Sequence, residues 1–188
     1  MKLSDIRIIG LLPDNKEHIR QTADLLFRGF REHNPNGWPT PAAALREVRK
    51  SLKKGHISRI AVDKNNKVLG WVGGINAHTN LWELHPIIIE PTYQGKGIGR
   101  VLIKDLEERV RERGGITIYA GADDEDNMTS VSGIDLYPNV LEHLMNIKNI
   151  KGHPYAFYEK MGFTIVGVIP DADGIGKPDI IMTKRVGG

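Results

Sequence analysis

The chain contains no cysteine among its 188 residues. This absence excludes disulfides, thiolate metal sites and a cysteine-bound acyl intermediate, and it is compatible with a reducing compartment. Long apolar runs are also missing, because near the N-terminus only Ile8 to Leu12 is apolar and Pro13 follows it. Such a pattern offers neither a signal peptide nor a membrane span, so we expect a cytoplasmic protein that does not contact membranes.

Basic residues are missing from one stretch of the chain. Between Gly114 and Ile147 there is no lysine or arginine, and this window has a formal charge of −6 in a chain of +3, so the remainder carries +9. Elsewhere lysine and arginine are spread along the chain, which gives no case for a nucleic-acid partner. The acidic residues of the window are Asp123, Asp124, Glu125, Asp126, Asp135 and Glu142.

The most informative stretch reads as a strand, a glycine-rich turn and a helix. Leu84 to Ile89 is apolar except for His85, which predicts a strand buried on both faces, and Pro91 ends it. From Ile98 to Val110 apolar residues recur every four positions, which predicts an amphipathic helix. Glycines at 95, 97 and 99 precede this helix and leave backbone N–H groups uncovered at its positive end, where an anion such as a pyrophosphate can bind.

The glycine spacing distinguishes between known phosphate-binding patterns. The Rossmann pattern requires a glycine where Arg100 stands, and nothing upstream of Gly95 and Lys96 supplies a Walker A motif. A structural turn into a helix is the alternative. The buried strand before the turn and the amphipathic helix after it favour a binding loop.

The remaining pattern predicts a single α/β or α+β domain with a central mixed, largely antiparallel sheet flanked by helices. Gly73-Gly74 predicts a bulge or a close backbone neighbour in the strand that contains it. Helices are expected at 14–30, 42–54, 140–147 and 153–160, and further strands at 6–12, 57–63, 68–75, 116–120, 163–169 and 179–184.

The loop pattern Gln94-x-x-Gly97-x-Gly99 resembles the pyrophosphate signature of the GNAT superfamily of acetyl-CoA-dependent N-acetyltransferases. The resemblance implies acetyl-CoA as the cofactor and no metal. The cofactor-binding residues that it implies are Ile87, Ile88, Ile89, Gln94, Gly95, Lys96, Gly97, Ile98, Gly99, Arg100, Tyr158 and Lys160.

Acetyl transfer to an amine needs a group that removes a proton, because amines arrive mostly protonated. Glu83 is the candidate base, since Trp82 and Leu84 beside it would partly desolvate its carboxylate. His85 projects to the same face by strand alternation and could relay the proton. The alternatives are a glutamate that points to water and a histidine satisfied in the core.

Several motifs resemble the chromosomal type of aminoglycoside 6′-N-acetyltransferase over about residues 57–184. The most specific is Trp82-Glu83-Leu84-His85-Pro86, and others are Asp135-Leu136-Tyr137 and the segment from His153 to Gly162. The resemblance implies a homodimer in which Glu83 is the base, the Ile87 amide polarises the thioester carbonyl and Tyr158 is the general acid. The expected residues for a polycationic substrate are Trp38, Glu83, Asp123, Asp124, Asp126, Asp135 and Tyr137.

Two alternatives remain open at this point. Acidic loops are often only solvated surface, although this one follows a strand next to the predicted cofactor site, where ligands bind in α/β sheets. The natural substrate could be a polyamine or a protein lysine, or the chain could be a non-catalytic acyl-CoA-binding module. The segment from Asn34 to Ala44 departs from the family pattern, which leaves the substrate range in doubt.

Overall fold

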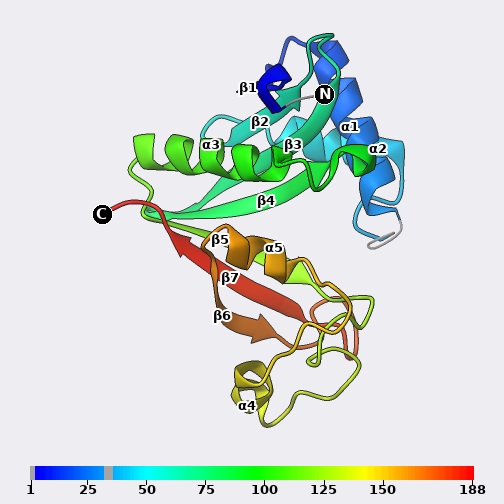
Figure 1. The fold of residues 1–188 in the computed structure, drawn as a ribbon, viewed down its shortest axis with the longest axis vertical. Coiled ribbons are helices and arrows are strands. Elements are labelled where there is room, and N and C mark those ends of the chain that lie inside the picture. The colour runs from blue at the N-terminus through cyan, green and yellow to red at the C-terminus, as the bar shows by residue number, and fades with distance from the viewer. Residues whose placement is uncertain (1–2, 32–35) are drawn as a thin grey trace. The chain divides into compact units, whose positions relative to one another are not determined.

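A computed structural model describes residues 3–31 and 36–188 (Figure 1). The contacts divide it into two units, Met1–Ile116 with Val186–Gly188, and Thr117–Arg185. Positions 34 and 35, the start of the segment from Asn34 to Ala44 that departs from the family pattern, lie outside the described residues. Each unit is described by itself below.

Four strands form the sheet of the first unit, and each pairs with the next in antiparallel fashion. Short turns connect the last three strands, and the first of these turns contains Asn65 and Asn66. The strands are β1 (Arg7–Gly10), β2 (Ile57–Val62), β3 (Val68–His78) and β4 (Leu81–Ile89).

Helices cover both faces of this sheet (Figure 1). Helices α1 (Lys16–Phe30) and α2 (Pro41–Lys50) bury one core with Trp71 of β3. Helix α3 (Ile98–Glu112) lies on the opposite face, where Leu102 and Leu106 contact the glycines of β3. Side chains cap the first two helices at their N-termini, with Asn15 accepting from the His18 amide and Thr40 from the Ala43 amide. The four-residue periodicity therefore predicted α1 and α3 correctly.

Strand β4 carries one extra residue relative to β3. Leu84 pairs with Gly74 and Ile87 pairs with Val72, so two residues of β4 lie opposite the single residue Gly73 of β3. The extra residue reverses the alternation of side chains between the two faces. Before it, Trp82 faces α3, where it contacts Arg113, and His85 faces α2. Beyond it, Ile88 packs in the α1–α2 core and Ile89 contacts the α3 side.

The prediction that β4 is buried on both faces is wrong. Its residues alternate between buried and half-buried along the whole strand. The three isoleucines suggested continuous burial, yet Glu83 and His85 keep one side of the strand partly open. Of the two alternatives predicted for Gly73-Gly74, the close backbone neighbour is confirmed, because a Cβ on Gly73 would collide with the His85 carbonyl oxygen, whereas the extra residue of the bulge belongs to β4.

The second unit is built on three antiparallel strands, in which β7 pairs with both β5 and β6. Two short helices and a long acidic loop connect them. These elements are β5 (Thr117–Asp123), α4 (Val140–Met145), α5 (Tyr155–Lys160), β6 (Thr164–Ile169) and β7 (Asp179–Arg185). All were predicted from the sequence within a few residues of their observed ends.

The contact at Gly73 generates a stability prediction. Gly73→Ala should lower the free energy of unfolding by about 1–3 kcal/mol, because its methyl group must displace a backbone carbonyl. Gly10→Ala is the control, since its nearest neighbours lie at 3.4 and 3.9 Å and belong to side chains. Urea midpoints that fall equally in the two variants would contradict the close packing of β3 against β4.

Candidate active site

Glu83 and His85 form a polar pair on the face of β4 that points toward α2. Their side chains are 30% and 37% exposed, and His85 Nδ1 lies 3.8 Å from Glu83 Oε1. The bulge, in which His85 and Pro86 lie opposite Gly73, separates this polar segment from the apolar end of the strand. Neither side chain is a buried core group, and the two predicted catalytic residues are brought together.

Trp38 borders the same pair. Its ring lies edge-on to Phe30 at 4.8 Å and is tilted toward the His85 ring at 5.9 Å. Phe30 ends α1 and Thr40 caps α2, so the two helices fix the position of the tryptophan between them. The predicted substrate residue Trp38 therefore lies next to His85, and its half-buried ring offers an apolar wall there.

The glycine loop has the conformation that an anion site requires. Gly95 and Gly97 have φ values of +71° and +87°, and Gly97 is the N-cap of α3. Among the described residues, the amides of 95–100 donate no backbone hydrogen bond, as expected for the start of a helix. These unpaired amides at the positive end of the helix dipole suit a pyrophosphate.

The side chains of the loop leave this concave backbone uncovered. Lys96 Nζ folds back to donate to the Thr92 carbonyl at 2.8 Å and lies 4.7 Å from the Tyr93 ring centre. Gln94 and Arg100 are exposed, and a Cβ on Gly95 would meet nothing within 4 Å. The residues present therefore fit the phosphate groups of a nucleotide cofactor.

Tyr158 lies in α5 of the second unit and is buried. Burial raises the pKa of its phenol well above the usual value, and the negative charges of Asp123 and Asp179 raise it further. The phenol therefore holds its proton at neutral pH, as a general acid must before it donates. Lys160, in the last turn of the same helix, is exposed.

Asp123 and Asp179 face each other as paired residues at the ends of β5 and β7. Burial raises the pKa of Asp179 to about 7, helped by the charge of Asp123 and opposed by a hydrogen bond from the Ala122 amide. One Asp179 oxygen is buried without a hydrogen-bond partner among the described residues. Two carboxylates in such a position share a proton, or accept a cation in its place.

Asp124 was predicted as a substrate residue, but the structure gives it another role. Its carboxylate is 1% exposed, and its two oxygens accept the backbone amides of Met128 at 2.7 Å and Thr129 at 2.8 Å. A carboxylate engaged in this way orders the loop and is not open to a ligand, so we correct that assignment. The neighbouring Asp126 is exposed.

Asp135 and Tyr137 lie in the same loop and are exposed. Asp135 Oδ1 accepts a hydrogen bond from the Tyr137 amide at 2.9 Å, and Oδ2 takes no part in that hydrogen bond. Both side chains are accessible to a ligand. They remain predicted substrate residues.

Two acidic residues near these sites were missed by the sequence reasoning. Asp179 lies outside the window that lacks basic residues, and only its pairing with Asp123 reveals it. Glu47 of α2 places Oε1 3.7 Å from His85 Nε2. No local pattern marks Glu47, because it lies among basic residues on an ordinary amphipathic helix.

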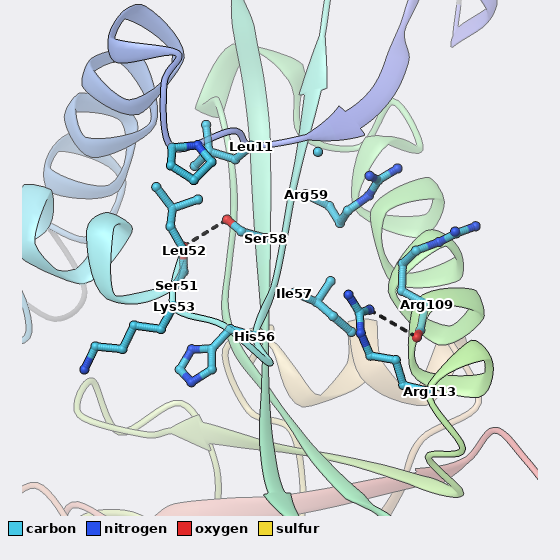
Figure 2. A pocket seen from close by; sticks show the side chains of 12 residues that line it. Leu11, Ser51, Leu52, Lys53, His56, Ile57, Ser58, Arg59, Arg109 and Arg113 are labelled. Atoms are coloured by element: carbon cyan, nitrogen blue, oxygen red, sulfur yellow. Dashed lines mark hydrogen bonds between the residues drawn. The ribbon is translucent and has the colours of Figure 1, made fainter.

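A cavity of about 220 Å³ occurs in the first unit, and none of the candidate site residues lines it (Figure 2). Lys53 and His56 extend to one side of β2, while Arg109 and Arg113 come from α3 on the other side. Arg59 is paired with Asp105 at 2.6 Å and Arg109 with Glu112 at 2.7 Å. The cationic side chains that line the cavity point apart, and two of them are neutralised by these carboxylates. The cavity is therefore not the candidate site.

Two searches of the described residues gave negative results. No cluster of three or more histidine, cysteine, aspartate or glutamate side chains in the described part could hold a metal ion. Within residues 3–31 and 36–188, no helix has the length and apolar character needed to cross a bilayer.

Asp179→Asn should change how stability depends on pH. Because the folded pKa of Asp179 is raised to about 7 from 3.8, the proton that it holds stabilises the fold at low pH, and this contribution is lost as pH rises from about 4 to 7. The variant should therefore gain about 1–2 kcal/mol relative to the parent between pH 5 and pH 8, a discounted figure because the group is partly exposed. Urea unfolding at both pH values measures it. Asp135→Asn, at an exposed carboxylate, is the control, and parallel profiles for Asp179→Asn and the parent would refute the raised pKa.

Comparison with known proteins places the chain in a family. Residues 21–137 match the family model "Acetyltransferase (GNAT) family". An aminoglycoside 6′-N-acetyltransferase complexed with coenzyme A has a TM-score of 0.86 and 37% identity over 96% of this chain and 97% of that one. The aminoglycoside 6′-N-acetyltransferase from Enterococcus faecium has a TM-score of 0.84 and 37% identity, with the same coverage of the two chains. An aminoglycoside 6′-acetyltransferase of type Ii has a TM-score of 0.71 and 32% identity, again over 96% of this chain and 97% of that one.

No curated protein sequence matches significantly. The chain has the GNAT fold, its acyl donor is acetyl-CoA, and it belongs to the GNAT family of acetyltransferases.

Proposed function

We propose that the protein transfers the acetyl group of acetyl-CoA to the 6′-amine of aminoglycosides, by direct transfer while both substrates are bound. The observation that carries the proposal is the Glu83–His85 pair, a partly exposed base and its neighbour on the strand Trp-Glu-Leu-His-Pro. Two aminoglycoside 6′-N-acetyltransferases of known structure are 37% identical to the chain over nearly its whole length. The chemistry of each residue supports the same assignment.

Glu83 removes the proton that prevents the amine from attacking. Its carboxylate is only 30% exposed, and the neighbouring His85 ring offers a second acceptor for the proton. A well-placed base of this kind contributes about 10²–10⁴-fold to the rate. The amine lone pair then forms the new bond to the acetyl carbon while the bond from that carbon to sulfur breaks.

Two further groups serve the thioester. The backbone N–H of Ile87 donates to the carbonyl oxygen as negative charge develops on it. Tyr158 gives its proton to the departing thiolate, and its buried, protonated phenol suits that role. The glycine loop and the first turn of α3 hold the pyrophosphate, with Gln94 to Arg100 and Ile87 to Ile89 as the binding segments and Lys160 as a further contact.

The acidic groups select a substrate with several positive charges. In the second unit, an ammonium group would replace the proton shared by Asp123 and Asp179, and Asp126, Asp135 and Tyr137 offer exposed contacts. In the first unit, Glu83 receives the reacting amine beside the Trp38 ring. An aminoglycoside carries several ammonium groups on rigid rings, so it offers cations of the kind that these carboxylates accept. We further infer, from the resemblance to the family, a homodimer that works in the cytoplasm.

A matched pair of aminoglycosides tests the reaction. Neomycin, which has a 6′-amine, should release free thiol from acetyl-CoA with this protein, whereas paromomycin, which has a hydroxyl there, should not. Glu83→Gln should lower kcat by about 10²–10⁴-fold because the base is lost. Thiol release with both compounds, or with polyamines at a higher kcat/KM, would defeat the proposed substrate. Unchanged kcat in Glu83→Gln would defeat the proposed base.

Two isosteric variants test the pyrophosphate loop. Gly97→Asp places a negative charge at the N-cap of α3, where the phosphates should lie, so the Kd for coenzyme A should rise by about 10-fold or more. Gly97→Asn is the control, because asparagine has nearly the same shape and tolerates the left-handed conformation of Gly97. Calorimetric titration with coenzyme A measures both. Equal affinities for the two variants would place the phosphates elsewhere.

A further inference from the structure

The imidazole of His85 lies between two carboxylates, one at each ring nitrogen. Nδ1 is 3.8 Å from Glu83 Oε1, and Nε2 is 3.7 Å from Glu47 Oε1. Both separations are somewhat longer than a hydrogen bond, as is common for catalytic groups in ligand-free sites, where contacts tighten when substrate binds. The two carboxylates come from different elements, β4 and α2, so their arrangement depends on the packing of α2 against the sheet.

Helix α2 directs Glu47 toward the sheet. The buried residues of the helix are Ala44 and Val48, and Glu47 lies directly beside them on the helical wheel. Its side chain is only 17% exposed, whereas Lys50, whose Nζ lies 3.6 Å from the same Oε1, is 51% exposed. A half-exposed pair between residues three apart contributes little to stability. The burial of Glu47 is therefore better explained by its contact with His85 than by its contact with Lys50.

Glu47 determines which nitrogen of a neutral His85 carries the proton. Each carboxylate only accepts hydrogen bonds and so favours a proton on the ring nitrogen that it faces. Glu47 is 17% exposed against 30% for Glu83, so water screens its contact less, and it favours the proton on Nε2 with the Nδ1 lone pair facing Glu83. We propose that Glu47 is a positioning residue, which holds His85 in the tautomer that can take a proton from Glu83. Carboxylates that orient the histidine of other enzymes act in the same way.

Both protons that the substrate nitrogen loses are accounted for: the first passes through Glu83 to His85, and the second, lost as the amide forms, restores the Tyr158 phenol that protonated the thiolate. The substrate ammonium gives its proton to the Glu83 carboxylate, and Glu83 passes it to Nδ1 of His85. The ring then carries a positive charge between two carboxylates, both of which stabilise it, and Glu83 is again an anion. The inference rests on the proposed function, because it assigns Glu47 a role in the same proton removal.

A double-mutant cycle tests whether Glu47 acts through His85. Glu47→Gln should lower kcat with the 6′-amine substrate by about 10–100-fold and leave the KM for acetyl-CoA unchanged. In a His85→Gln background the same substitution should cost less than about 2-fold, because the group through which it acts is gone. Lys50→Gln is the matched control, since it removes the other partner of the same oxygen, and kcat should stay within about 2-fold of the parent. Additive losses, or equal losses in Glu47→Gln and Lys50→Gln, would overturn the inference.

A measurement on the free protein tests which tautomer His85 adopts, independently of turnover. The side-chain ¹⁵N shifts of His85, assigned by the signals that vanish in His85→Gln, report which ring nitrogen carries the proton when recorded well above the reference pKa of histidine. The parent and Lys50→Gln should show the Nε2–H form, and Glu47→Gln should shift toward Nδ1–H, because the glutamine amide can donate to Nε2. Unchanged shifts in Glu47→Gln would overturn the positioning role. An inactive parent with the expected tautomer shift would instead reject the proposed substrate and keep the contact.

Discussion

The arrangement of the first unit depends on one close approach, between the backbone of Gly73 in β3 and the carbonyl of His85 in β4. Any Cβ at position 73 would collide with that oxygen, so only glycine allows the extra residue of β4 to fit against β3. The extra residue turns the strand over. Glu83 and His85 consequently point toward α2, while the end of the strand returns to an apolar environment. The polar pair thereby lies on the same face of the strand as the apolar core that Ile88 joins.

Electrostatics divides the acidic groups of the second unit into two kinds. Asp124 is buried and its oxygens accept backbone amides, so its charge is satisfied inside the loop. Asp123 and Asp179 face each other, and burial, helped by the charge of Asp123, raises the pKa of Asp179. Such a pair is stabilised by any cation that displaces its proton. Burial, and after it the same negative charges, raise the pKa of the Tyr158 phenol in this unit.

Local patterns in the sequence were sufficient for the secondary structure and the glycine loop. Helix α3 and its positive-φ glycines followed from the apolar repeat and the spacing at 95–99, because each depends on neighbours in the chain. The faces of β4 could not be predicted, since the bulge that sets them is a property of two paired strands. The same holds for Glu47 and Asp179, which are marked only by their partners from distant parts of the sequence. Asp124 was wrongly assigned because composition records that a carboxylate is present and not what its oxygens accept.

The hydrogen bonds that a carboxylate accepts indicate whether it is free to take part in catalysis or binding. Asp63 resembles Asp124, since it is nearly buried and accepts the amides of Asn65 and Lys67 with one oxygen. Each closes a turn, and replacing it would release backbone donors without affecting a substrate directly. Within the described part of the chain, Glu47 and Glu83 accept no hydrogen bond from a backbone amide, and each faces a nitrogen of the same imidazole. A carboxylate kept away from backbone donors but beside a titratable ring retains the capacity to exchange a proton. The assignment of function to acidic residues in this fold therefore depends on what their oxygens accept more than on how many of them cluster in the sequence.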